Sequence, residues 1–286
     1  MKTTARFFFY FVMGVMAFAC TQEGDVLVTD NNQQEYSEDN EHIKYILMNG
    51  RTVHKFLYDQ TGKFVEENSR LYFNKFSYDE KERLVKVESA IHPAAWSSSS
   101  YVIDGIDDMM TSQNSSATSY SLYFYDNAGR LSKIEYYSNM GNEPDGEFEH
   151  RSTQTFEYKG SLIDRVNLGD PTTIQTAPTV YEYTYDSRGN VINEKYYTNI
   201  NSTPKLSSET SYKFDDYRNP FQIKKSYGKP GFYSNPNNII EIIFTSYEDI
   251  PGIDKYSTSK QTYEYNSNDY PVKIIQDGKT VEEYVY

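Results

Sequence analysis

The chain has a single cysteine, Cys20, and a single tryptophan among its 286 residues. A lone cysteine excludes a disulfide within the chain, so stability has to come from buried side chains and backbone pairing. Histidines are few, and they lack the paired spacing of a zinc site, since they stand apart at His42, His54, His92 and His150. We therefore expect no metal ion and no other cofactor.

Positive charge is also scarce, because 28 basic residues face 41 acidic ones. Nucleic-acid binding depends on clustered Lys and Arg side chains that contact phosphates. The basic residues here are scattered among acids, as Lys224 and Lys225 illustrate. We therefore expect no nucleic-acid partner.

Long apolar runs are missing beyond the first 19 residues. There, Lys2 and Arg6 form a basic start, residues 7–18 form an apolar run, and Ala19 precedes Cys20. The run is shorter than the roughly 20 residues that a membrane-spanning helix needs. The pattern is similar to a bacterial lipoprotein signal, which implies acylation of the cysteine after cleavage. We expect residues 1–19 to be a signal peptide and Cys20 to be the lipidation site that holds the protein to a membrane.

Residues 20–42 are polar and acidic and offer little to bury, which predicts a disordered tether. Cleavage would remove Lys2 and Arg6 and change the net charge from −13 to −15. The acidic tract after Cys20 is similar to the signal that exports Bacteroidota-type lipoproteins to the cell surface. We expect a lipid anchor in the outer membrane. The domain could face either the cell surface or the periplasm.

From Ile43 onward a short unit recurs, in which an aromatic residue and an acid precede a polar turn and an apolar strand. Clear copies occupy residues 58–64, 78–84, 125–131 and 185–191, a shortened copy lies at 158–160, and degenerate copies lie at 214–220 and 265–271. The acid is placed to accept backbone N–H groups two residues on. Gly62, Gly129 and Gly189 stand where such a turn needs a positive φ. Because Glu82, Arg218 and Asp269 replace this glycine, we expect those three turns to be strained or reshaped.

The flanking residues alternate as strands should, with Tyr181 and Tyr183 on one face and Glu182 on the other. We expect one domain over residues 43–286. Its fold class is all-β, an antiparallel meander of repeated β-hairpins.

The Tyr-Asp-x-x-Gly-Arg-Leu units resemble the YD repeats of the RHS type, and the mature chain resembles Bacteroidota-type lipoproteins with degenerate YD (RHS-like) repeats. The resemblance implies that the all-β meander curls into a strongly curved or barrel-like sheet, and it implies no known activity. Regular units are too few and too unevenly spaced for the large shells of RHS toxins, so no toxin-enclosing role is carried over.

The uneven spacing of the turns predicts long connections at the opposite end of the sheet. We expect loops at residues 89–119, 140–149, 169–179, 199–207 and 228–238. Binding residues concentrate on loops that a rigid scaffold holds. Trp96, Tyr101 and Tyr233 fall in these loops and are candidate ligand-binding residues, as a platform for sugar rings. The alternative is that they only pack.

No residue is expected to be catalytic. The turn acids recur in nearly every unit, which favours a structural role over the unique carboxylate pair of a glycoside hydrolase. We therefore expect a non-enzymatic, lipid-anchored cell-envelope protein that presents a binding or scaffold surface to a glycan or an envelope protein. The first alternative is a carbohydrate-binding accessory lipoprotein of a glycan-uptake system. A glycoside hydrolase is a second alternative, and an integral outer-membrane barrel is a third, which the charged residues on both faces of most strands disfavour.

Overall fold

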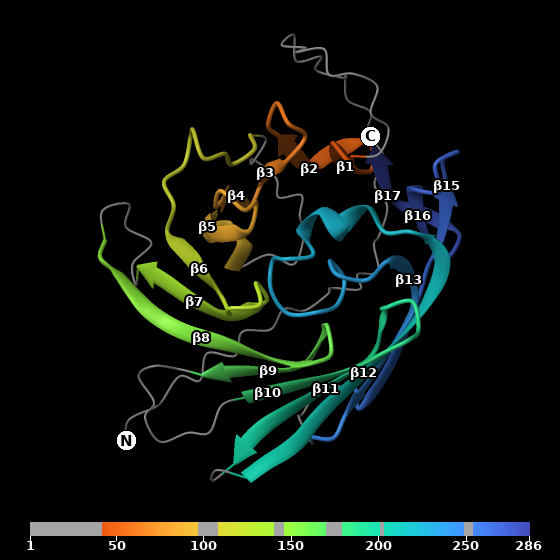
Figure 1. Cartoon of the computed structure of the whole chain (residues 1–286). Coiled ribbons are helices and arrows are strands. Elements are labelled where there is room, and N and C mark those ends of the chain that lie inside the picture. Colours follow the sequence, from red (N-terminus) through yellow and green to blue (C-terminus); the bar gives the residue numbers. More distant parts are fainter. Residues whose placement is uncertain (1–41, 97–107, 140–145, 170–178, 201–202, 249–253) are drawn as a thin grey trace, which may run out of the picture. The chain divides into compact units, whose positions relative to one another are not determined.

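The structure is a computed structural model that describes residues 42–96, 108–139, 146–169, 179–200, 203–248 and 254–286 (Figure 1). These residues form strands and two short 3-10 helices, and no helix among them is long and apolar enough to cross a bilayer. The strands are β1 (Tyr45–Met48), β2 (Arg51–Tyr58), β3 (Phe64–Ser69), β4 (Tyr72–Tyr78), β5 (Leu84–Ile91), β6 (Ser119–Tyr125), β7 (Leu131–Asn139), β8 (Phe148–Lys159), β9 (Leu162–Gly169), β10 (Thr179–Tyr185), β11 (Val191–Ile200), β12 (Thr203–Arg218), β13 (Asn237–Ser246), β14 (Tyr256–Lys260), β15 (Thr262–Tyr265), β16 (Pro271–Gln276) and β17 (Lys279–Val285). The helices are η1 (Pro93–Trp96) and η2 (Pro220–Lys224).

The strands form one antiparallel meander. Each strand from β1 to β13 pairs with the next strand along the chain, β15 to β17 continue the series, and β17 pairs with β1. The segments β14 and β15 are consecutive parts of one stretch that meet at Gln261; β14 pairs with β13 and β15 with β16. The sheet thus curls into a nearly closed, barrel-shaped ring (Figure 1), which confirms the predicted fold class.

The predicted turns form through their acids. The Oδ1 atom of Asp126 accepts the N–H groups of Ala128 and Arg130, each at 2.9 Å. The Arg130 hydrogen bond, helped by the Arg130 charge, lowers the pKa of the Asp126 carboxyl. The same pair of backbone contacts recurs at Asp59, Asp79, Asp186 and Asn266. Each turn is therefore held by its own acid or amide, as the sequence predicts.

Replacement of the turn glycine has two different outcomes. Glu82 and Asp269 keep the turn and adopt the left-handed backbone, with φ of 62° and 66°. Arg218 does not, because β12 runs through it and the chain then turns inward as η2. The expectation of strained or reshaped turns is confirmed. The prediction of a hairpin turn at residues 214–220 is wrong, since the connection from β12 to β13 is an insert, residues 219–236.

In the described part of the chain, a ladder of six tyrosine hydroxyls ties most of the units to a neighbour. The hydroxyl of Tyr78 donates to the carbonyl of Phe64 at 2.7 Å, and that of Tyr125 to the carbonyl of Leu84 at 2.8 Å. Equivalent bonds join Tyr158 to Leu131, Tyr185 to Ile163, Tyr286 to Pro271 and Tyr58 to Ile43. The sixth unit carries Phe214 in place of the tyrosine, so the ladder is interrupted where the insert begins.

The inner face of the ring forms one hydrophobic core. Buried residues from strands all around the sheet contribute to it, among them Phe56, Phe76, Val166 and Ile274, and Phe221 of the insert belongs to the same cluster. The core is thus built around a segment that enters from one end of the ring (Figure 1).

The outer face carries a cross-strand row of alternating charges. Register pairs Glu157 with Arg165, Arg165 with Glu182, Glu182 with Lys195, and Lys195 with Glu209. Arg165 and Glu182 form an ion pair of 2.5 Å between half-exposed side chains. Charges of this density suit contact with water.

Two of the predicted loops are wrong. Residues 199–207 belong almost entirely to β11 and β12, whose ends pair from Ile200 to Thr203, so the connection is short. Residues 228–238 lie mostly in the insert, at the end of the ring that carries the turns rather than at the long-loop end. The spacing of the turns predicted a long connection at both places, but cross-strand pairing and burial inside the ring decided their structure.

Candidate functional site

The insert turns inward because Asn219 ties its two ends together. The Oδ1 atom of the buried Asn219 accepts the N–H of Phe221 at 2.9 Å. Its Nδ2 atom donates to the carbonyls of Phe232 and Asn235, at 2.7 and 2.8 Å. Pro220 follows at the first turn of η2, where the missing N–H of a proline costs no hydrogen bond.

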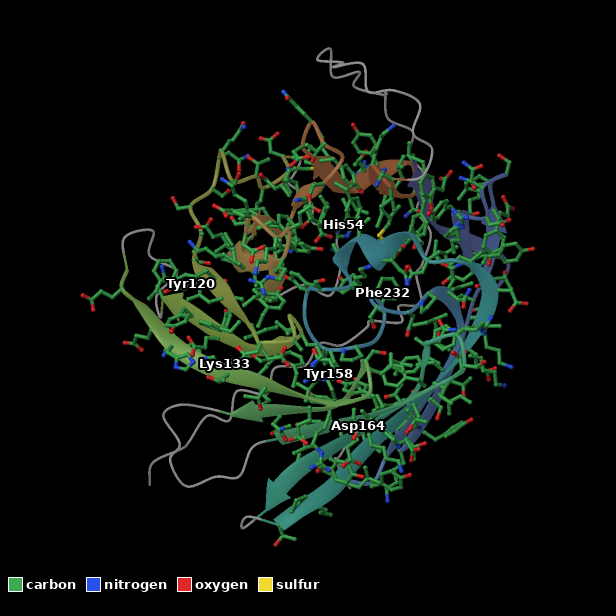
Figure 2. All side chains as sticks on the ribbon, in the orientation of Figure 1. His54, Tyr120, Lys133, Tyr158, Asp164 and Phe232 are labelled. Carbon is green, nitrogen blue, oxygen red and sulfur yellow. The ribbon has the colours of Figure 1, made fainter. Side chains whose placement is uncertain are left out.

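Aromatic packing then holds the insert against several walls of the ring. The ring of Phe221 lies 6.2 Å from Phe56 on β2 and 5.7 Å from Tyr284 on β17, measured between ring centres. The hydroxyl of Tyr123 on β6 donates to the carbonyl of Tyr227 at 2.7 Å. Figure 2 shows His54 and Phe232 on the inner side of the sheet.

A buried ion pair fixes the insert to β3. The Nζ atom of Lys224 lies 2.5 Å from the Oε2 atom of Glu67, and these side chains are 3% and 5% exposed. Glu67 also accepts hydrogen bonds from the hydroxyl of Tyr72 at 3.1 Å and the amide of Asn74 at 3.3 Å. His54 completes the cluster, with its Nδ1 atom 3.5 Å from Oε1 of Glu67.

The electrostatics of this cluster keep Glu67 ionised. Burial opposes the charged form of Glu67, but the charge of Lys224 and the hydrogen bond from His54 outweigh it and lower the pKa of the carboxyl well below its ordinary value. On β17, burial instead raises the pKa of Glu282, and the nearby charge of His54 only partly opposes this. The Glu67 carboxylate is thus engaged by its own neighbours, as expected of a structural anchor.

A second cation secures the far side of the insert. Lys229 pairs with Glu194 on β11 at 3.1 Å and lies over the ring of Tyr181 on β10, 4.0 Å from its centre. Together with Lys224, it spans the interior from β3 to β11. The insert therefore occupies the space that a ligand inside the ring would need.

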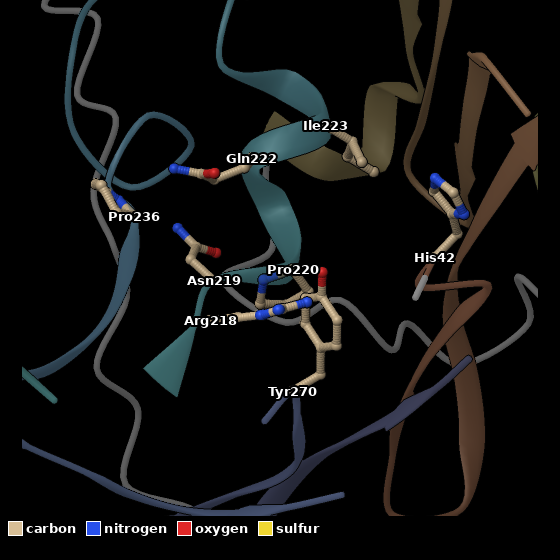
Figure 3. A pocket seen from close by; sticks show the side chains of 8 residues that line it. All are labelled: His42, Arg218, Asn219, Pro220, Gln222, Ile223, Pro236 and Tyr270. Carbon is tan, nitrogen blue, oxygen red and sulfur yellow. The ribbon is translucent and has the colours of Figure 1, made fainter. Parts of the chain in front are cut away.

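The end of the ring that carries the turns is called the rim. A cleft of about 340 Å³ lies at the rim, beside the start of the insert (Figure 3). Its lining includes His42, Arg218, Gln222, Ile223, Pro236 and Tyr270. Figure 3 shows Arg218 lying beside Tyr270, with Gln222 and Asn219 on one side and His42 and Ile223 on the other.

Two arginines of the neighbouring turns pair with the acid of their own turn. Arg83 contacts Asp79 at 2.6 Å, and Arg130 contacts Asp126 at 2.9 Å. The guanidinium carbon of Arg218 lies 5.5 Å from the centre of the Tyr270 ring, and Arg218 lines the cleft.

Of the three residues predicted as a sugar platform, Tyr233 has its side chain among the described residues. Tyr233 lies in the insert. The centre of its ring is 4.6 Å from the Nζ atom of Lys224 and 5.3 Å from the centre of the Phe232 ring. Trp96 ends η1 at the opposite end of the ring, and its side chain lies outside the described residues. Tyr101, Cys20, the signal peptide and the tether up to residue 41 also lie outside them.

The described histidines and acids do not form a metal site, since no group of three or more metal-binding side chains is clustered among the described residues. Nothing in the sequence assigned Glu67, Lys224 or Arg218 to a site. One signal of an irregular connection was present in the sixth unit, where Phe214 replaces the tyrosine and Arg218 replaces the glycine. Pro220 follows directly after this unit.

No family model and no curated protein sequence matches the chain. Among solved structures, it is similar to a porin-like protein from Bacteroides vulgatus ATCC 8482, at 10% identity over 86% of this chain and 98% of that chain, with a TM-score of 0.46. A porin-like protein from Bacteroides uniformis ATCC 8492 matches at 10% identity over 81% and 89% of the two chains, with a TM-score of 0.33. TcdB2-TccC3 without its hypervariable C-terminal region matches at 12% identity and a TM-score of 0.20, over 79% of this chain, which spans 14% of that one. None of these likenesses assigns an activity to the chain.

Proposed function

We propose that this chain is a non-enzymatic, lipid-anchored protein of the cell envelope that presents a binding surface on the outside of its ring. The observation that carries the proposal is the insert, which fills the interior and is fixed at Lys224 and Lys229 to opposite walls. A ligand that meets the folded protein therefore meets its rim or its outer face.

The chemistry of the described carboxylates supports a role without catalysis. Catalytic acids and bases have to reach a substrate in a cleft. The turn acids are instead bonded to their own backbone, as at Asp126, and Glu67 is bonded to Lys224.

The location rests on the sequence, where Cys20 follows a signal-like segment and precedes an acidic tract. Several acyl chains on Cys20 would hold the protein stably, since each buried methylene contributes about 0.8 kcal/mol. The charged outer row at Arg165 and Glu182 supports a domain that stands in water beside the outer membrane. Either face of that membrane is compatible with it.

A carbohydrate-binding accessory role in a glycan-uptake system is the second candidate. The observation that favours it is the rim cleft, which combines the ring of Tyr270 with polar groups of Arg218 and Gln222. Aromatic rings and amide groups are suited to sugar rings and their hydroxyls.

The test of the anchor is membrane fractionation of the full chain and of Cys20→Ala. We expect the wild type in the membrane fraction and the variant in the soluble fraction, with Ser97→Ala as a control that stays in the membrane. Unchanged membrane association of Cys20→Ala contradicts the anchor. A glycan array with the full chain in detergent then distinguishes the carbohydrate-binding role from a protein-binding or scaffold role.

A further inference from the structure

The rim cleft lies between the insert and the turn of residues 266–270, where the tyrosine ladder departs from its pattern. Phe214 lacks the hydroxyl, and the hydroxyl of Tyr265 in the next unit donates to the carboxylate of Asp215 and not to a backbone carbonyl. Arg218, which replaces the turn glycine, has an exposed side chain.

The ionisable side chains that line the cleft are basic, whereas the protein as a whole is acidic. The chain carries a net charge of −13. The described residues that line the cleft include the basic side chains of Arg218 and His42 and no acidic residue. A locally basic lining in an acidic protein favours an anionic ligand at this position.

The other lining groups indicate what the rest of the ligand is. The ring of Tyr270 offers a flat apolar face, and Pro236 adds apolar surface beside it. The amide of Gln222 offers both a donor and an acceptor, which suits hydroxyl groups. A cavity of about 340 Å³ accommodates one small ring compound rather than a large ligand.

We propose that this cleft binds an anionic sugar, whose carboxylate or sulfate ester pairs with Arg218 while its ring packs against Tyr270. The proposal rests on the binding role proposed above and narrows its ligand class. Arg218 suits this contact because a planar guanidinium donates two parallel hydrogen bonds to a carboxylate or sulfate group. His42 lines the cleft on the side away from Arg218 (Figure 3).

The test measures binding of glucuronic acid, galacturonic acid and glucose 6-sulfate to the full chain by saturation-transfer NMR and calorimetry, with glucose and galactose as neutral counterparts. We expect at least one acidic sugar to bind on the order of tenfold more tightly than its neutral counterpart, with binding that weakens as salt increases. The two kinds of acidic sugar show whether the charged group is a carboxylate or a sulfate ester.

Arg218→Gln should weaken binding of the acidic sugar on the order of tenfold or more, because a charge-assisted hydrogen bond is lost. The matched control is Arg188→Gln, which removes the same charge from the same rim, where Arg188 contacts Asp186 at 3.3 Å and Asp216 at 2.5 Å. Gln222→Ala is a second cleft variant, and thermal unfolding of each variant identifies any loss of fold.

The proposal is overturned by no preference for acidic sugars, by equal loss in Arg218→Gln and Arg188→Gln, or by no loss in either cleft variant. Binding of a neutral glycan that is insensitive to Arg218→Gln rejects the cleft and leaves the proposed binding role intact. If no sugar binds, the proposed ligand of the cleft is also rejected. Membrane association of the wild type through Cys20 would then still support the envelope role.

Discussion

Lys224 and Glu67 are 157 residues apart in sequence, yet Nζ of Lys224 donates to Oε2 of Glu67 at 2.5 Å inside the ring. Both side chains are almost fully buried. Breaking such a pair leaves one charge without its partner in a medium that solvates it poorly. The position of the insert therefore depends on one contact between two distant parts of the chain.

Glu67→Gln should lower the free energy of unfolding by about 3–5 kcal/mol, because Lys224 stays buried without a counter-charge. Urea unfolding followed by circular dichroism measures this. The matched control is Glu82→Gln, which breaks the exposed pair of Lys63 and Glu82 at 3.1 Å, where Glu82 is 76% exposed. That change should cost less than about 1 kcal/mol. Equal effects of the two variants would show that the buried pair contributes no more than a surface pair.

Replacing both members of the buried pair tests whether the unpaired charge, and not the loss of the contact, causes the destabilisation. The double variant Glu67→Met with Lys224→Met should cost less than Glu67→Gln alone, because it leaves no unpaired charge. The phenyl rings of Phe56 and Phe64, which lie 5.4 and 5.9 Å from Nζ of Lys224, provide apolar neighbours for the new side chains. A double variant that is less stable than the single one contradicts this account.

Stability should also depend on pH through Glu67. Its pKa is lower in the folded chain than the ordinary value of 4.5, so the ionised carboxylate stabilises the fold above that pH, and this contribution is lost as the pH falls below it. Between about pH 5 and 2, unfolding free energy should therefore fall more steeply for the wild type than for Glu67→Gln. The turn acids, such as Asp126, have lowered pKa values in both proteins and cancel in the comparison. Parallel pH curves would rule out a contribution from Glu67.

The tyrosine ladder yields a third prediction. Tyr125→Phe removes the hydrogen bond to the carbonyl of Leu84, which is 2.8 Å long, and should lower the free energy of unfolding by about 1 kcal/mol. The control is Tyr256→Phe, at a side chain that is 61% exposed, which should change it by no more than about 0.5 kcal/mol. If both variants unfold at the same urea concentration, the ladder bonds do not stabilise the ring.

The hairpins were predictable because their chemistry is local. An acid such as Asp126 bonds to backbone groups two and four residues on, and Gly129 adopts the positive φ of 78° that the turn needs. The alternation of Tyr181 and Glu182 assigned the faces of β10 in the same local way. An all-β meander of hairpins follows from these features, whereas its curvature was expected from the resemblance to YD repeats.

The insert was not predictable, because its structure depends on distant partners. Nothing near Lys224 in sequence indicates that Glu67 lies beside it. The degenerate unit at Phe214 and Arg218 showed that a turn would fail, but not that the chain would enter the ring. For the same reason the cleft beside Tyr270 was missed, and Tyr233 was assigned to the wrong end.

The turn glycines yield the last prediction, which separates backbone strain from steric contact. Gly129 has a φ of 78°, and a Cβ atom added there would meet no atom within 4 Å. Any loss in Gly129→Ala therefore comes from the backbone, and we expect about 1–2 kcal/mol, measured by urea unfolding. The reciprocal change is Glu82→Gly, at a φ of 62°. It removes the backbone strain but increases the conformational entropy of the unfolded chain, so it should stabilise the fold by at most about 1 kcal/mol. A Gly129→Ala variant as stable as the wild type would mean that the turn acid alone determines the turn, because the left-handed backbone would then cost nothing.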